Sequence, residues 1–251
     1  MKKNIKDTIR NILKRFYFYG NRFFCPCCGG HFRKMRPYEG SFYIRGELIN
    51  AYTKNALCPN CGSHMRYRFL LTFLKNNTNV LKERIKLLHF APEIKTSEFL
   101  KRQKNIEYIA GDIDPSLYVD TMKIDITNIN FPDNNFDAVI ASHVLEHVKE
   151  DKKAISEIFR VTKAGGWAVL VVPIYKEPFE DVNLDYAGRE RMYGIGGHVR
   201  LNSLEDFKLK LINAGFKVHI YSFDDIPGEY IDRTAVSLYT ESDKRLFFCK
   251  K

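Results

Sequence analysis

LLHFAPE (Leu87 to Glu93) opens the stretch of this chain that decides its fold, and RVTKAGGWAVLVVP (Arg160 to Pro173) closes it. Between them stand EYIAGDIDPS (Glu107 to Ser116) and DITNINFPDNNFDAVIASHVLEHV (Asp125 to Val148). Short β-rich runs alternate here with helix-like segments, which is typical of a parallel sheet covered by helices on both faces. Acidic residues follow the expected strand ends, where such sheets bind ligands. The stretch therefore predicts an α/β fold with a ligand site at one edge of the sheet.

FPDNNFDAVIASHVLEHV and KAGGWAVLVVP together resemble the class I S-adenosylmethionine-dependent methyltransferases of the type 11-like group. The resemblance extends from Leu87 to about Ile220 and rests on four segments in the same order. It implies a Rossmann-like, seven-stranded sheet, S-adenosyl-L-methionine as the cofactor and methyl transfer as the reaction. The LH-x-APE pattern at the end of the first strand resembles one bacterial subgroup of this family. We expect this methyltransferase domain to occupy residues 65–251.

The length and hydropathy of the chain limit the classes of protein to consider. Its 251 residues suffice for one α/β domain with a smaller appendage. No apolar run approaches the roughly 20 residues of a membrane-spanning helix. The start, MKKNIKDTIRNILKRF, lacks the apolar core of a secretory signal. We therefore expect a cytoplasmic protein, with peripheral binding at the inner membrane face as an open alternative.

The positive charge of the chain is concentrated at one end. The net charge is +10, but residues 1–86 hold 18 Lys or Arg against 4 Asp or Glu, whereas residues 87–251 hold 22 against 26. A simple solvated surface is one interpretation. A segregated excess of this size more often indicates an acidic partner, such as RNA, an anionic membrane or a phosphate-bearing carrier.

Residues 1–19 are predicted to form a basic amphipathic helix. Ile5, Ile9, Ile12, Leu13 and Phe16 recur at helical spacing, and lysines and arginines occupy much of the remaining circumference. Two interpretations carry equal weight. The helix either docks on its own domain or contacts a membrane surface that holds a lipid-linked acceptor.

Two C-x-x-C pairs define a second element, expected at residues 20–64. CPCC begins at Cys25 and CPNC begins at Cys58, and a glycine follows each pair. Two such turns can present four thiolates to one tetrahedral ion, which predicts a zinc ribbon with a structural Zn²⁺. A redox C-x-x-C is the weaker alternative because it needs only one pair. The predicted ligands are Cys25, Cys28, Cys58 and Cys61, with Cys27 as a substitute for one of the first two.

The resemblance also implies a set of cofactor contacts. Family members normally have a glycine-rich loop after the first strand, but here that loop reads HFAPE, without glycine. A carboxylate at the second strand end accepts both ribose hydroxyls, and a later one binds the adenine amino group. Asp114 and Asp120 are the respective alternatives to these two carboxylates. The implied cofactor-binding residues are Phe90, Ala91, Pro92, Glu93, Asp112, Ile113, Asp125, Ile126, Ser142 and His143.

Residues 174–199 lose all periodicity and predict a long loop that serves as a lid or binding segment. This is where the family inserts its acceptor-recognition element. His198 is the predicted general base, because imidazole titrates near neutral pH, although a purely structural histidine is an equal alternative. His143 is predicted to orient the acceptor, whereas His147 is predicted to pack. Arginines suggest a phosphate or carboxylate on the acceptor, and the predicted substrate contacts are Arg189, Arg191, Tyr193 and Arg200.

Three functions are compatible with these residues. The favoured one is direct in-line O-methylation of a sugar, a glycan-linked molecule or another small polar acceptor. The first alternative is an RNA methyltransferase that binds nucleic acid through the basic zinc ribbon, although ASHV stands where an NPPY-type motif would follow the fourth strand. The second alternative is a non-catalytic binding module. The missing glycines favour that module, whereas Asp112 and Asp125 disfavour it.

Overall fold

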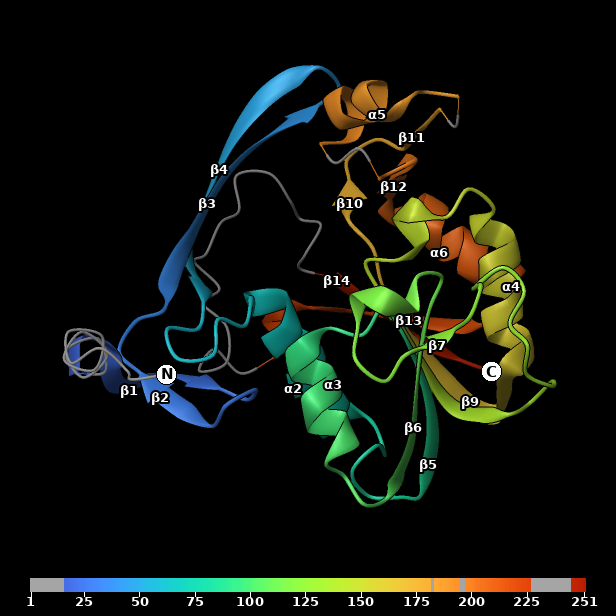
Figure 1. Cartoon of the computed structure of the whole chain (residues 1–251), viewed down its shortest axis with the longest axis horizontal. Helices are drawn as coiled ribbons and strands as arrows, with labels where there is room; N and C mark the ends of the chain where they lie inside the picture. Colours follow the sequence, from blue (N-terminus) through green and yellow to red (C-terminus); the bar gives the residue numbers. More distant parts are fainter. Residues whose placement is uncertain (1–15, 182, 195–196, 227–244) are drawn as a thin grey trace.

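The computed structural model describes residues 16–181, 183–194, 197–226 and 245–251 (Figure 1). Among these residues, seven strands form the central sheet in the order β13-β14-β9-β8-β5-β6-β7, with β14 antiparallel to both of its neighbours. This arrangement confirms the predicted Rossmann-like methyltransferase sheet. The strands are β5 (Ile85–Phe90), β6 (Ile106–Asp112), β7 (Met122–Lys123), β8 (Phe136–Ser142), β9 (Thr162–Val171), β13 (Lys217–Ser222) and β14 (Arg245–Lys250).

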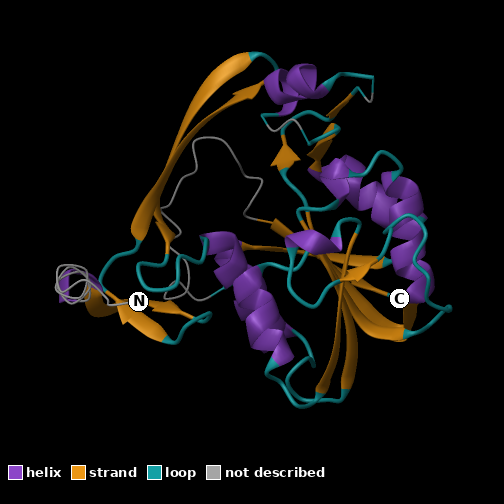
Figure 2. Cartoon of the chain, in the orientation of Figure 1, coloured by secondary structure: helices purple, strands orange, loops and turns teal. Residues whose placement is uncertain are grey.

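Helices cover both faces of this sheet (Figure 2). One face packs against α2 (Met65–Asn77) and α3 (Ile94–Lys101), and the other against α4 (Asp151–Val161) and α6 (Leu204–Asn213). Successive strand residues alternate between these faces: Leu87 packs in the core under α2 and α3, and Leu88 packs in the core under α4 and α6. No helix in the described part of the chain combines the length and apolarity needed to cross a bilayer.

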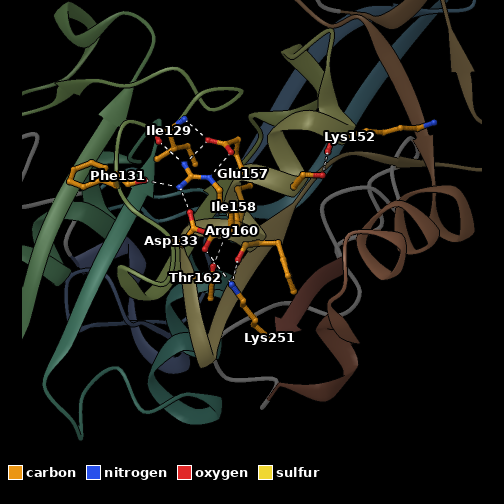
Figure 3. A network of polar contacts seen from close by, with 11 residues as sticks. Ile129, Phe131, Asp133, Lys152, Glu157, Ile158, Arg160, Thr162 and Lys251 are labelled. Carbon is orange, nitrogen blue, oxygen red and sulfur yellow. Dashed lines mark hydrogen bonds and ion pairs between the residues drawn. The ribbon is translucent and has the colours of Figure 1, made fainter.

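A polar network fastens the β8 side of the sheet to α4 (Figure 3). The Arg160 guanidinium donates to both carboxylate oxygens of Glu157, at 2.7 and 2.8 Å, and to the carboxylate of Asp133. It also donates to the carbonyl oxygens of Ile129 and Phe131. These bonds hold the loop that leads into β8 against the helix.

Most elements of the domain agree with the predictions. The segments quoted from the sequence contain most of β6 and all of β8 and β9, with helices between strands, and Ser203 caps α6 by accepting from the amide of Asp206. The main difference lies in residues 174–199. Instead of a structureless loop, this insert contains β10 (Ile174–Tyr175), β11 (Phe179–Glu180) and α5 (Tyr186–Tyr193), and β12 (Arg200–Ser203) pairs with both short strands.

The N-terminal appendage consists of two hairpins. β1 (Tyr19–Cys25) pairs with β2 (Gly30–Phe32), and β3 (Arg36–Ile44) pairs with the long β4 (Glu47–Leu57). The expected zinc-ribbon strands are therefore present. The predicted basic helix lies outside the described residues over positions 1–15.

The β3–β4 hairpin, here called the arm, reaches from the cysteine-rich end across to α5 (Figure 1). Its tip is the turn at Arg45 and Gly46, both at positive φ (51° and 83°). The two turn amides donate to the carbonyl oxygens of Met192 and Arg191, each at 2.9 Å. The last carbonyls of a helix lack intrahelical partners, so the arm caps the C-terminal end of α5.

Candidate functional site

The loop after β5 takes a glycine-like shape without a glycine. Ala91 has a φ of 43°, in the left-handed region, and its amide donates to the Gly111 carbonyl oxygen at 3.0 Å. Left-handed backbone costs an L-residue about 1–2 kcal/mol, and the smallest side chain limits that cost. Phe90 before it and Pro92 after it are buried. The backbone turn that a cofactor loop requires is thus present.

Glu93, the next residue of this loop, belongs to a buried polar chain. The imidazole of His89 lies between the Tyr108 hydroxyl, 2.9 Å from Nδ1, and Glu93 Oε2, 3.1 Å from Nε2. Burial alone would raise the pKa of Glu93, but the hydrogen bond and charge of His89, with the nearby Ser142 hydroxyl, outweigh it and lower that pKa. Glu93 Oε1 is buried and has no hydrogen-bond partner among the described residues. A buried carboxylate oxygen without a partner fits a site for a donor group on a ligand.

Two further carboxylates, the half-buried Asp112 and the exposed Asp125, follow neighbouring strands of the same sheet. Asp112 ends β6 and accepts from the Asp114 amide at 2.8 Å, and Asp125 follows β7 and accepts from the Thr127 amide at 2.8 Å. The Ile124 amide donates to the Asp112 carbonyl oxygen, which fixes the two segments together. Each carboxylate therefore has a fixed orientation and remaining acceptor capacity. Ile113 is exposed beside Asp112, whereas Ile126 is 7% exposed.

The alternative carboxylates have other partners. Asp114 accepts from the amide and hydroxyl of Ser116 and caps a 3₁₀ turn at Pro115–Leu117. Asp120 forms an ion pair with Lys101 at 3.3 Å. Asp125 also accepts from the amide and hydroxyl of Thr127, so local contacts alone do not separate the predicted ligands from their alternatives.

At the end of β8, a histidine and a glutamate form a close pair. His143 follows Ser142, has a φ of 57°, and its amide donates to the Val171 carbonyl oxygen at 2.8 Å. His143 Nδ1 lies 3.1 Å from Oε1 of Glu146, a residue with no exposed surface. Burial would raise the pKa of Glu146, but its hydrogen bond with His143 and the surrounding histidines lower it. A carboxylate in this position fixes the tautomer and orientation of an imidazole.

His198 comes to the same glutamate from the distant insert. Its Nε2 lies 4.0 Å from Glu146 Oε1, and the amide of Val199 donates to the Glu146 carbonyl oxygen at 2.9 Å. Burial lowers the pKa of His198 to about 4, which makes it a weaker base at neutral pH than an exposed imidazole. His147, predicted to pack, is instead exposed, and its ring centroid lies 4.6 Å from that of His198.

The predicted substrate residues fall into two groups. Arg189 and Arg191 lie on α5 at the tip of the arm, and Arg191 is exposed. Tyr193 is 1% exposed, and its hydroxyl bonds the backbone of Asp181. Arg200 is 2% exposed and donates to the Leu145 and Lys149 carbonyl oxygens and to Glu180. These bonds indicate that Tyr193 and Arg200 brace the backbone around them. Binding of the acceptor by the two residues stays a prediction.

The four predicted zinc ligands come together at the base of the appendage. The Sγ atoms of Cys25 and Cys61 lie 3.8 Å apart, as do those of Cys28 and Cys58. Four sulfurs about 2.3 Å from a tetrahedral zinc ion would be separated by roughly 3.8 Å. The glycines after each pair, Gly29 and Gly62, have φ of 71° and 72°, so the two turns match. Cys25 and Cys28 join this group of potential ligands, whereas Cys27 does not.

Sequence reasoning missed four residues of these sites. His89 and Tyr108, which fix Glu93, stand within β strands and resemble ordinary core positions. Glu146 lies within the apolar run VLEHV, and a charged residue there is the signal that could have revealed it. Arg68 carries no sequence signal of burial, yet it is 1% exposed and donates to the Asn55, Ala56 and Ser63 carbonyl oxygens beside the second cysteine pair.

Comparison with known families agrees with this geometry. Residues 92–170 match the Methyltransf_11 family, described as a methyltransferase domain. Demethylmenaquinone methyltransferase of Renibacterium salmoninarum is 39% identical over 93 residues, which cover 36% of this chain and 33% of that protein. Sterol 24-C-methyltransferase of Yarrowia lipolytica is 30% identical over 47% of this chain and 31% of that protein. The chain thus spans about a third of the length of these relatives.

Solved structures share the fold at lower identity. A Mesorhizobium loti S-adenosylmethionine-dependent methyltransferase matches with a TM-score of 0.51 and 13% identity, over 71% of this chain and 95% of that chain. Burkholderia thailandensis 1,6-didemethyltoxoflavin-N1-methyltransferase, solved with S-adenosylhomocysteine, matches with a TM-score of 0.50 and 12% identity, over 74% and 77%. The family match identifies residues 92–170 as methyltransferase sequence, and the solved structures share the fold of the class I S-adenosylmethionine-dependent methyltransferases. Within that class, the matched family is Methyltransf_11.

Proposed function

We propose that this chain transfers a methyl group from S-adenosyl-L-methionine to an oxygen atom of a small polar acceptor, such as a sugar or a glycan-linked molecule. The observation that carries this proposal is the pairing of His143 with buried Glu146 directly after β8, a strand of the same parallel sheet in which β6 ends at Asp112. A hydroxyl becomes a good nucleophile only when its proton is removed, and an imidazole oriented by a carboxylate is suited to that step.

The residues around the sheet edge fit the cofactor. Asp112 would accept the ribose hydroxyls, and Asp125 would accept the adenine amino group, with Ile126 against the ring. Glu93 Oε1, buried and without a partner among the described residues, would accept from the ammonium of the methionine part. When bound, the sulfonium of the cofactor supplies an electrophilic methyl group. The protein contributes mainly the positioning of this methyl group against the acceptor oxygen.

Of the two predicted catalytic histidines, His143 has the stronger support as the proton acceptor. It follows the β8 terminus directly, and Glu146 holds its Nδ1 at 3.1 Å. His198 as the base is less favourable, because burial lowers its pKa to about 4. The proton of the acceptor hydroxyl would pass to the His143 imidazole, and the Glu146 carboxylate would stabilise the resulting imidazolium.

The α5 insert and the arm are proposed to bind the acceptor. Arg189 and Arg191 lie on α5, and the backbone of Arg45 at the arm tip bonds the end of that helix, so three arginines come from adjoining segments. Such a group is suited to a phosphate or carboxylate on the acceptor. If that phosphate belongs to a lipid-linked carrier, the basic residues at positions 1–19 would place the enzyme at the inner membrane face.

The four-cysteine group is proposed to hold a structural zinc ion. All four ligand positions would then come from protein, which leaves no open position for catalysis. The ion would fix the two knuckles from which the arm extends toward α5. Zinc would therefore act on acceptor binding through the arm and not on the transfer step.

Alanine substitution of His143 tests the catalytic assignment. A general base contributes about 10²–10⁴-fold to rate, so His143→Ala should lower kcat by a factor in that range. Its calorimetric affinity for S-adenosylhomocysteine should stay near that of the wild type. His219→Ala, an exposed histidine on β13, is the matched control. An unchanged kcat in His143→Ala would refute the assignment, and absent cofactor binding in the wild type would refute the enzyme.

RNA methylation is the second candidate, and the arm favours it. Tyr43 and Tyr52 are exposed on this basic appendage, and exposed aromatic residues among cations can stack on bases. Binding of an RNA oligonucleotide that falls steeply with salt would support this candidate. The names of two relatives raise carbon methylation as a third outcome, so the methylated atom must be assigned in the product by NMR.

A further inference from the structure

Three side chains lie together beside the proposed base, and two of them, His147 and His198, have no part in the proposed transfer step. Glu146, His147 and His198 each offer one ligand atom, and these atoms lie within 4.8 Å of one another. Two of the residues come from the 3₁₀ turn after β8, and the third comes from the distant insert. Glu146 has no exposed surface and His198 is 5% exposed, whereas His147 is open to solvent.

The two buried members of this group have unused polar atoms. Glu146 Oε2 and His198 Nδ1 are both buried and without a hydrogen-bond partner among the described residues. His198 Nε2 lies 4.0 Å from Glu146 Oε1, which is too long for a hydrogen bond. A buried carboxylate oxygen without a partner is unfavourable, so a native structure normally supplies one.

The spacing suits a metal ion. Histidine nitrogens and carboxylate oxygens lie about 2.0–2.2 Å from a bound zinc-like cation, so two ligands of one ion are roughly 3–4.3 Å apart. The 4.0 Å between His198 Nε2 and Glu146 Oε1 falls in that range. The three ligand atoms lie within 4.8 Å of one another, slightly beyond the roughly 4.3 Å limit. Because His147 is exposed, a small rotation of its side chain can bring its ring nitrogen into this range.

We propose that Glu146, His147 and His198 bind one divalent first-row transition-metal cation, at a site separate from the four-cysteine centre. Two imidazoles and one carboxylate are a common ligand set for such ions. Glu146 Oε1 lies near both His198 Nε2 and His143 Nδ1, and a carboxylate oxygen has a second lone pair with which it can bind the ion while it accepts from His143. Three protein ligands leave at least one position for water or for an oxygen of the acceptor. Any effect of this ion on the acceptor rests on the proposed function, but metal binding itself can occur without methyl transfer.

Cobalt(II) is the probe for this site. The zinc-loaded chain is titrated with Co²⁺ while the visible absorption spectrum is recorded. Because thiolates retain zinc in preference to cobalt, Co²⁺ should enter the second site, with nitrogen and oxygen ligand bands and no thiolate charge-transfer band. We expect one equivalent of Co²⁺ to bind.

Two variants decide the assignment. His147→Ala and His198→Ala should each weaken Co²⁺ binding about tenfold or more, whereas the control His219→Ala should leave it unchanged. His147→Ala removes an exposed side chain and should fold, which keeps the test valid if His198→Ala does not. Absence of Co²⁺ binding, or equal binding in wild type and His147→Ala, would overturn the inference.

Calorimetry with S-adenosylhomocysteine on the same samples separates the two proposals. Cofactor binding without Co²⁺ binding would remove only the metal site. Co²⁺ binding without cofactor binding would leave the metal site and remove the proposed function.

Discussion

The amide nitrogen of Gly46 lies 2.9 Å from the carbonyl oxygen of Arg191, and this bond joins the arm to α5. Together with the neighbouring bond from Arg45 to Met192, it ends α5 with groups from a segment about 145 residues earlier in the chain. The appendage and the methyltransferase domain thus build one side of the proposed acceptor site together.

Substitution of Gly46 should affect the acceptor and spare the cofactor. Gly46 has a φ of 83°, which a β-branched residue adopts only with about 1–2 kcal/mol of strain. Gly46→Val should therefore displace the arm tip and raise the KM for the acceptor several-fold, with S-adenosylhomocysteine affinity unchanged. Gly46→Asn is the matched control, because asparagine tolerates this conformation. Equal KM values for Gly46→Val and wild type would argue against acceptor binding at the arm.

Removal of either sheet-edge charge should weaken cofactor binding. Hydrogen bonds to charged groups contribute about 1.5–3 kcal/mol, against about 1 kcal/mol for neutral ones. Asp112→Asn and Asp125→Asn should each raise the Kd for S-adenosylhomocysteine about tenfold, measured by isothermal calorimetry. Asp120→Asn, which loses only an exposed ion pair with Lys101, should bind normally. Should the three variants bind alike, the cofactor site would have to lie elsewhere.

Substitutions of different cysteines should have different effects on the zinc content of the protein. Elemental analysis of the wild type should find one zinc per chain at the four-cysteine group, and Cys58→Ser should lose it and unfold at a lower temperature. Cys27→Ser should keep its zinc, because Cys27 lies outside this group. Zinc loss in Cys27→Ser would show that this thiol replaces Cys25 or Cys28 as a ligand.

Acid should destabilise the domain partly through Glu157. Its hydrogen bonds with Arg160 lower the pKa of Glu157, so the stabilisation is complete above the unfolded pKa of about 4.3 and is lost as pH falls through the lower folded value. Glu157→Gln should reduce the free energy of unfolding by about 1–3 kcal/mol at pH 7 and by less at pH 3. Urea denaturation at both pH values measures this difference.

Glu98→Gln is the control for that experiment. Glu98 pairs only with Lys95 on the exposed side of α3, and such pairs contribute about 1 kcal/mol or less. A pH dependence that is the same in Glu157→Gln and in the wild type would show that other carboxylates dominate acid unfolding.

Local sequence signals were sufficient to predict most of the sheet and the cysteine centre. The strands Phe136–Ser142 and Arg245–Lys250 have dense apolar runs bounded by turn residues, and their burial follows directly from that pattern. The four cysteines were identifiable because their spacing alone constrains the geometry. The same is true of Asp112, which ends a recognisable strand.

Contacts between segments that are distant in the chain could not be predicted from local sequence patterns. The capping of α5 by Gly46, the approach of His198 to Glu146 and the bracing by Arg200 each join residues far apart in the chain. Arginine is normally exposed, so the burial of Arg68 and Arg200 followed from no local pattern. Ala91 shows the same limit in the backbone, since nothing in HFAPE predicts a left-handed alanine.

The place of β14 between β9 and β13 has a consequence for synthesis on the ribosome. Strands emerge in chain order, so β9 presents an unpaired edge until residues 245–250 leave the exit tunnel. Such an edge is a template for pairing with another nascent polypeptide. The two C-x-x-C pairs emerge earlier, so they can bind a metal ion while β9 still lacks β14.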